Sequence, residues 1–152
     1  MTTDSYGNYT QSGRKGYNSR TIKVDQLVET TWYRLLVSLS GASDKTSFDT
    51  TGWTLTATVT AQSVTCVGQP AADATWTTVT TPSITYSWEG VTSSSSTASV
   101  GINDVTAGFS GSDKGSGKTI KVTVSASGYN HNSGTYSASV TLHKYGKSYY
   151  NG

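Results

Sequence analysis

The sequence contains few of the residues that build disulfides, helices or catalytic centres. Its 152 residues include one cysteine, Cys66, together with two histidines and two glutamates. A single cysteine cannot form a disulfide within the chain, so packing must hold the fold together, and this fits synthesis in a reducing compartment. The shortage of long helix-forming side chains argues against a helical fold.

Long apolar segments are missing as well. No apolar stretch of signal-peptide length follows Met1, and no run of about 18 consecutive apolar residues occurs anywhere. We therefore expect neither Sec secretion nor a membrane span, and we expect the protein to remain where it is made, in the host cytoplasm, or to leave by lysis.

Threonine and serine dominate the composition, with 27 and 24 copies, or about a third of the chain. They alternate with apolar side chains, and this period of two is typical of strands with one buried face. The clearest case is Trp53 to Ala61, where four threonines alternate with Trp53, Leu55, Ala57, Val59 and Ala61. After Gln62 and Ser63 the apolar parity changes to Val64 and Cys66, which predicts a β-bulge or a change of sheet.

Residues 118–144 predict a β-hairpin. Ile120, Val122 and Val124 share one parity, as do Tyr136, Ala138, Val140 and Leu142 in the following run. The segment between the two runs is rich in glycine, asparagine and serine, which suit a hairpin loop. Further strands are expected at Trp32–Ser40 and Ser83–Gly90, with a weaker one around Ala98 to Ile102. This pattern favours an all-β antiparallel sandwich or barrel.

Three features together resemble an immunoglobulin-like sandwich. Trp88 follows Cys66 by 22 residues and points inward on a central strand, and the last two strands form a tight hairpin. The ending VTVSASGYN…SASVTL is similar to that of bacterial and phage domains of this class, and the resemblance covers residues 50–143. Val122 and Val124 occupy the positions where the second cysteine of an antibody-type disulfide would lie, so Cys66 is expected to be a small buried apolar side chain.

The resemblance implies an accessory protein of tailed-phage virions, displayed on heads, tails or fibres. It favours a non-enzymatic capsid decoration or auxiliary protein, located in the virion, whose partner is the major capsid protein or another virion protein. A homo-oligomer is compatible with this reading.

The charge distribution suggests three regions. Residues 1–24 form a basic arm with a net charge of +3, residues 25–143 form the immunoglobulin-like sandwich, and residues 144–152 form a basic and aromatic tail. Cations beside aromatic rings suit adaptable protein contacts. We therefore predict docking through these side chains: Tyr6, Tyr9, Arg14, Lys15, Tyr17, Arg20, Tyr145, Lys147, Tyr149 and Tyr150.

Two other functions remain open at this stage. A carbohydrate-binding or host-adhesion module would use exposed loop residues such as Trp76, Tyr129 and His131 to contact a host-surface glycan. The alternative for Trp76, which we favour, is a side chain folded over the end of the sandwich. The basic ends are also compatible with nucleic acid, which we rank last.

Motifs for catalysis, cofactors and metals are not apparent. Ser112–Thr119 nearly matches a phosphate-binding loop, but it precedes an expected strand, whereas the motif requires a helix. Neither a histidine-centred catalytic arrangement nor a carboxylate pair can be named. Asp104 and Asp113 are expected to cap turns, since no run of acidic residues supplies several oxygen ligands for Ca²⁺. We therefore expect no enzyme activity, no cofactor and no metal site.

Overall fold

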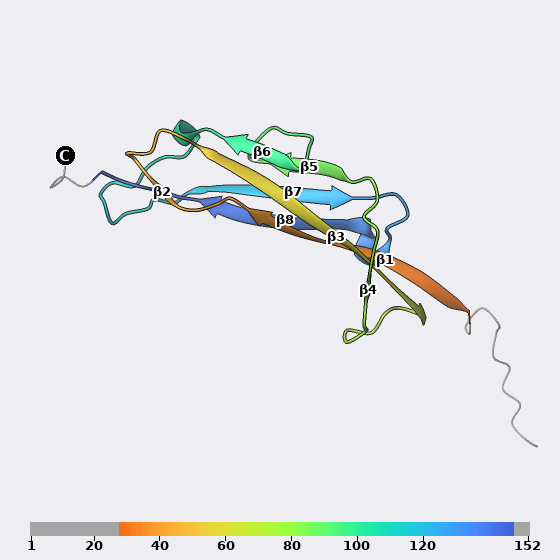
Figure 1. Ribbon diagram of the computed structural model, residues 1–152. Helices are drawn as coiled ribbons and strands as arrows, with labels where there is room; N and C mark the ends of the chain where they lie inside the picture. The colour runs from red at the N-terminus through yellow and green to blue at the C-terminus, as the bar shows by residue number, and fades with distance from the viewer. Residues whose placement is uncertain (1–27, 148–152) are drawn as a thin grey trace, which may run out of the picture. The chain divides into compact units, whose positions relative to one another are not determined.

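The computed structural model describes residues 28–147, so most of the expected arm and residues 148–152 of the tail lie outside the described part (Figure 1). The described residues divide into two units, residues 28–30 with 67–69 and residues 31–66 with 70–147. Val28 and Val67, in the first unit, are exposed. The second unit holds the paired strands described below.

One sheet is organised around the long strand β3 (Trp53–Val67), which lies beside β1 (Glu29–Ser40). The short strands β4 (Thr77–Val79) and β6 (Thr97–Val100) pair antiparallel with β3 at its two ends. Trp53 faces Val100 at one end, and Ala61 faces Val79 at the other. The expected strands at Trp32–Ser40 and Trp53–Ala61 are therefore confirmed.

The second sheet has the order β5-β7-β8, in which β5 is Thr85–Glu89, β7 is Lys118–Ser125 and β8 is Thr135–Leu142. All pairs in it are antiparallel. The predicted hairpin is confirmed, and its register places Ile120 opposite Val140 and Val122 opposite Ala138. Its connection contains the short 3-10 turn η3 (His131–Gly134).

A third, smaller pairing joins parts of the chain that are far apart in sequence. β2 (Lys45–Thr46) pairs in parallel with β9 (Lys144–Tyr145). The 3-10 turn η2 (Ile102–Asp104) follows β6, and Lys144 extends its amine to the Ile102 carbonyl oxygen at 2.8 Å. Strand pairing thus continues two residues beyond position 143, where the sequence suggested that the sandwich ends.

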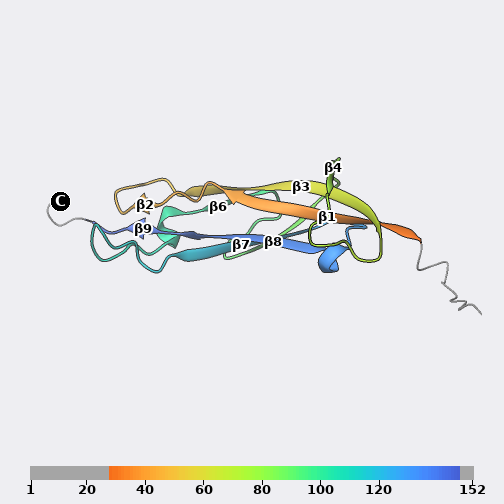
Figure 2. The ribbon, with the colours of Figure 1, turned by 90° about the horizontal axis from the view of Figure 1, so that it is seen from below.

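The core lies between the two main sheets, which form separate layers in Figure 2. One apolar cluster contains Trp53, Leu55, Val100, Val105, Ile120 and Leu142, and the other contains Leu35, Ala57, Ala61, Val122 and Val124. Trp88 packs against both clusters, and its indole nitrogen donates to the Ser95 carbonyl oxygen at 2.8 Å. The protein is therefore an all-β sandwich with Trp88 directed inward, as the sequence predicted.

β3 is continuous through Gln62 and Ser63, and its pairing with β4 keeps one register there. The predicted change of parity is seen beyond that point, where Val64 and Cys66 are half-buried and Thr65 is exposed. One expectation for β3 needs correction. Cys66 is half-buried rather than buried, because it lies close to the end of β3, whereas the central part of the strand fills the core. No helix among residues 28–147 is long and apolar enough to cross a membrane.

Candidate docking surface

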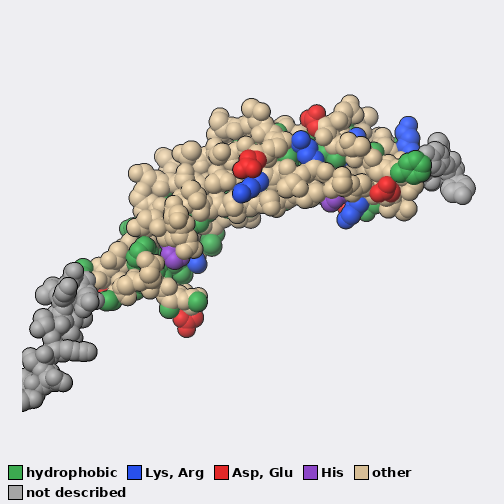
Figure 3. All heavy atoms as spheres, turned by 180° about the vertical axis from the view of Figure 1, so that it is seen from behind, with side chains coloured by type: hydrophobic (Ala, Val, Ile, Leu, Met, Phe, Trp, Pro, Cys, Tyr) green, Lys and Arg blue, Asp and Glu red, His purple; other side chains and the backbone are tan. Residues whose placement is uncertain are grey.

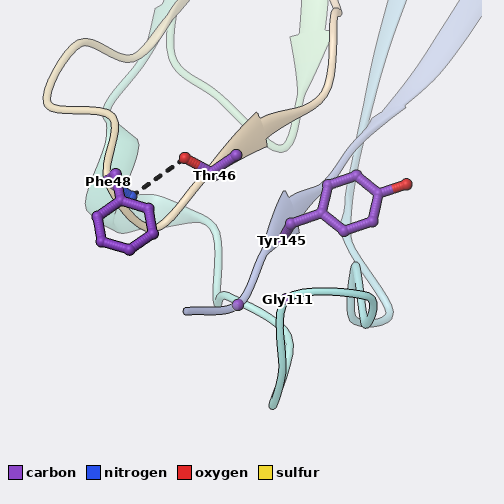
Figure 4. Close-up of a pocket in the computed structure, with 5 residues that line it drawn as sticks. Thr46, Phe48, Gly111 and Tyr145 are labelled. Atoms are coloured by element: carbon purple, nitrogen blue, oxygen red, sulfur yellow. Dashed lines mark hydrogen bonds between the residues drawn. The ribbon is translucent and has the colours of Figure 1, made fainter. Parts of the chain in front are cut away.

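A shallow groove lies at the end of the sandwich where β2 and β9 pair. Its volume is about 340 Å³, and it is lined by Thr46, Phe48, Gly111, Tyr145 and Gly146. Figure 4 shows Phe48 and Tyr145 on either side of Gly111, with the hydroxyl of Tyr145 turned away from Phe48. Two sides of the groove are thus aromatic side chains, and Gly111 between them carries no side chain.

The Phe48 side of the groove is built by a tight turn after β2. The Thr46 amide donates to Asp49 Oδ2 at 2.7 Å, and the Phe48 amide donates to Thr46 Oγ1 at 3.2 Å. The Ser47 amide donates to the Tyr145 carbonyl oxygen at 2.8 Å, which fixes the turn to β9. Phe48 consequently stands outward and is 58% exposed.

The opposite side is built by the segment from Gly108 to Asp113, which is tied to β9. The Gly108 amide donates to the Lys144 carbonyl oxygen at 2.8 Å, and the Gly146 amide donates to the Asp113 carbonyl oxygen at 3.1 Å. Phe109 projects from this segment and is 79% exposed. Both sides of the groove therefore depend on backbone hydrogen bonds to residues 144–147.

Asp113 holds this segment together as a turn cap. Its carboxylate accepts the amide of Phe109 at 2.8 Å and that of Gly115 at 2.9 Å. These two hydrogen bonds, the one from Phe109 first, hold the pKa of Asp113 below its ordinary value of 3.8. Asp104 is engaged in the same way, since its Oδ2 accepts the Gly101 amide at 3.0 Å. The expectation that both aspartates cap turns is confirmed.

The Asp113 cap should make the local structure acid-sensitive. Because its pKa is lowered on folding, the cap contributes fully above about pH 3.8 and its contribution is lost as the pH falls through the lower, folded value. The protection of the Phe109 and Gly115 amides, measured relative to their intrinsic exchange rates at each pH, should therefore decrease below pH 3.8 in the wild type. In Asp113→Asn the two amides should be less protected at neutral pH, without that acid transition. An unchanged transition in the variant would contradict the assignment.

Charged side chains lie beside the groove. Lys147 Nζ lies 5.8 Å from the centroid of the Phe48 ring, close enough for a cation–π contact, and Lys147 is exposed. The Asp49 carboxylate is nearby, but it accepts both the amide and the hydroxyl of Thr46. Figure 3 shows hydrophobic side chains at the surface of this end, next to basic and acidic ones. Lys147 is therefore a cation close to the groove lining.

A second aromatic cluster surrounds Trp76. The Arg34 guanidinium carbon lies 4.1 Å from the Trp76 ring centroid, and the His131 ring lies 5.0 Å from it. Trp32 approaches His131 at 6.3 Å, and Arg34 Nε donates to Gln62 Oε1 at 2.8 Å. This cluster thus joins residues from four parts of the chain: β1, β3, the β7–β8 connection and the segment before β4. Trp76 is half-buried, so it packs onto the sandwich rather than standing clear of it.

Tyr129 belongs to a separate contact on the β7–β8 connection. Its ring lies 5.3 Å from that of Tyr33, and burial raises the pKa of its hydroxyl. Tyr136 anchors the same connection by donating to the His131 carbonyl oxygen at 2.6 Å. Asn132 and Ser133 have positive φ angles of 51° and 71°. The three predicted recognition residues therefore divide between two contacts, with Trp76 beside His131 and Tyr129 against Tyr33.

The predicted docking residues are placed unequally. Tyr145 and Lys147 come together at the groove. The others lie outside the described residues: Tyr6, Tyr9, Arg14, Lys15, Tyr17, Arg20, Tyr149 and Tyr150. Sequence reasoning missed Phe48, although a phenylalanine in a polar loop is a usable signal when the chain has only two.

The phosphate-loop look-alike is a turn that leads into β7, with positive φ angles at Gly115 and Gly117. Within residues 28–147, no three His, Cys, Asp or Glu side chains are grouped so that they could hold a metal ion. Comparison with protein-family models, curated proteins and solved structures finds no match to this chain.

Proposed function

We propose that this protein is a non-enzymatic virion structural protein, a capsid decoration or auxiliary protein that docks on the major capsid protein or another virion protein. The observation that carries the proposal is the groove, where exposed Phe48 stands beside Tyr145 and Lys147. Exposed apolar surface that is rimmed by polar side chains is typical of interaction sites. Two of the side chains predicted for docking lie there.

The strand order supports the immunoglobulin-like part of this proposal. In that fold one sheet places the second strand between the first and the fifth, and the other sheet runs C-F-G. Here β3 pairs with β6 and lies beside β1, while β7 lies between β5 and β8. An inward tryptophan on the strand equivalent to C also agrees, because Trp88 lies on β5. Virion accessory modules of this class are what the sequence resembles.

Binding to the particle would result from several weak contacts whose free energies add. The groove is small, so one copy gains modest affinity there. The basic segment 1–24 supplies further contacts to an acidic surface. Many copies on one particle would then add avidity and stabilise the shell, since ligands that bind only the assembled state favour that state.

Docking can be measured on purified particles from the culture that produces the protein. The protein should band with intact particles in a density gradient at a constant ratio to the major shell protein. In reconstitution on particles lacking it, deletion of residues 1–20 and the substitution Phe48→Ser should each reduce occupancy by at least tenfold, while far-UV circular dichroism shows the fold retained.

Leu36→Ser is the matched control, because Leu36 is also an exposed apolar side chain, at 44%, but lies on β1 outside the groove. Its occupancy should equal that of the wild type. If the protein is absent from particles, or if the deleted protein occupies them fully, the proposed function is wrong.

A further inference from the structure

We propose that the groove binds an aromatic or aliphatic side chain that neighbours a carboxylate in an acidic segment of the partner protein. This inference rests on the proposed docking function and specifies the chemistry of its partner. It is carried by the size of the groove, the state of its polar groups and the position of Lys147.

The groove suits one apolar side chain. Its volume of about 340 Å³ is at the lower end of the range for ligand pockets. Phe48 and Tyr145 line it as aromatic walls, and aromatic faces and edges favour contact with another ring or with an aliphatic chain. Gly111 carries no side chain, so an inserted group can approach the backbone there.

The polar side-chain atoms of the turn that forms the Phe48 side of the groove, Thr46 Oγ1 and the Asp49 carboxylate, are already engaged within the chain. Thr46 Oγ1 interacts with Asp49 Oδ2 at 3.3 Å and accepts the Phe48 amide. The Asp49 carboxylate also accepts the Thr46 amide. A sugar needs several protein groups that form hydrogen bonds with its hydroxyls, and Thr46 and Asp49 already use theirs within the turn. An apolar side chain needs no hydrogen-bonding partner.

The positive charge of Lys147 favours a negatively charged group next to the apolar side chain that enters the groove. Its amine lies against the Phe48 ring and is exposed, so a carboxylate beside the inserted group could reach it. A second copy of this chain would bring another Lys147 to the same place if the grooves faced each other. Like charges repel, and an acidic partner is therefore favoured over self-association.

The test uses small probes and amide chemical shifts of the full-length protein. We expect 3-phenylpropionate to shift the amides of Thr46–Phe48, Gly111 and Tyr145–Lys147 saturably, with a Kd on the order of 1–10 mM for a ligand of this size. 3-Phenylpropylamine, which has the same ring and the opposite charge, should bind about fivefold more weakly. Methyl β-D-glucoside should not shift these amides.

Two variants and their matched controls separate the contributions. Phe48→Ser should abolish saturable binding, and Lys147→Gln should remove the preference for the carboxylate. Leu36→Ser and Lys121→Gln, on β1 and β7, should behave as the wild type. Equal binding of the two charged probes, no saturable shift up to about 20 mM, or binding of the glucoside in their place would overturn the inference. Particle occupancy that persists with such a result would leave the docking function intact and reject only this partner chemistry.

Discussion

Replacing Trp53 with alanine is expected to lower the free energy of unfolding by about 3–5 kcal/mol. Trp53 is 3% exposed and belongs to the apolar cluster with Leu55, Val100, Val105, Ile120 and Leu142. Its indole nitrogen also donates to the Ser43 carbonyl oxygen at 2.7 Å. The substitution would therefore leave a cavity in the core. It would also remove the hydrogen bond that holds the β1–β3 connection, on which Phe48 lies, to the core.

Urea denaturation followed by circular dichroism measures this loss. Trp53→Phe is the matched control, since it keeps an aromatic ring in the core but removes the bond to Ser43, and it should cost about 1–2 kcal/mol. Amide exchange at Phe48 should increase in both variants. A loss below about 1 kcal/mol in Trp53→Ala would mean that this cluster does not support the fold as its burial implies.

Replacing Gly146 with alanine is expected to cost about 3 kcal/mol, at the upper end of the usual penalty for overpacking. A Cβ at this position would collide with the Gly108 carbonyl oxygen and lie 2.6 Å from the Ser110 carbonyl oxygen. These are backbone atoms, so they cannot rotate away as a side chain could. Either β9 or the segment from Gly108 to Asp113 must move, and the groove between them must change shape.

The same denaturation experiment, with the probe titration repeated on the variant, tests this. Gly128→Ala is the matched control: its φ is +80° and no heavy atom lies within 4 Å of the added Cβ, so only backbone strain of about 1 kcal/mol is expected. If Gly146→Ala proves as mild as Gly128→Ala and still binds the probe as the wild type does, the close packing under the groove is not required.

The alternation of polar and apolar side chains alone predicted the main strands, because each of them has one solvent-exposed face and one buried face. Ile120, Val122 and Val124 are completely buried, as their shared parity required. At Gln62 and Ser63 the parity of the apolar side chains changes although β3 continues: Val64 and Cys66 beyond this point are half-buried, and Thr65 is exposed. A change of parity shows that the other face of the strand is now covered. Which face is covered depends on the elements that pack against the strand as well as on the path of its backbone.

The candidate groove was predicted in part. Tyr145 and Lys147 were identified from their cation and aromatic pattern, but Phe48 was not, because it lies about 100 residues earlier in a loop without periodicity. The pairing that unites them, β2 with β9, has two residues in each strand. Two residues are too few to show a period of two, and no local signal indicates a parallel partner at such a separation.

The sequence by itself determined the all-β class, the hairpin and the inward direction of Trp88, since these follow from local alternation and turn chemistry. The tertiary structure alone decided where Phe48, Gly111 and Gly146 meet, and that Trp76 packs between Arg34 and His131. Those contacts join segments from different strands and loops. Their geometry depends on how the two sheets and their end connections pack, and no local sequence pattern carries that information.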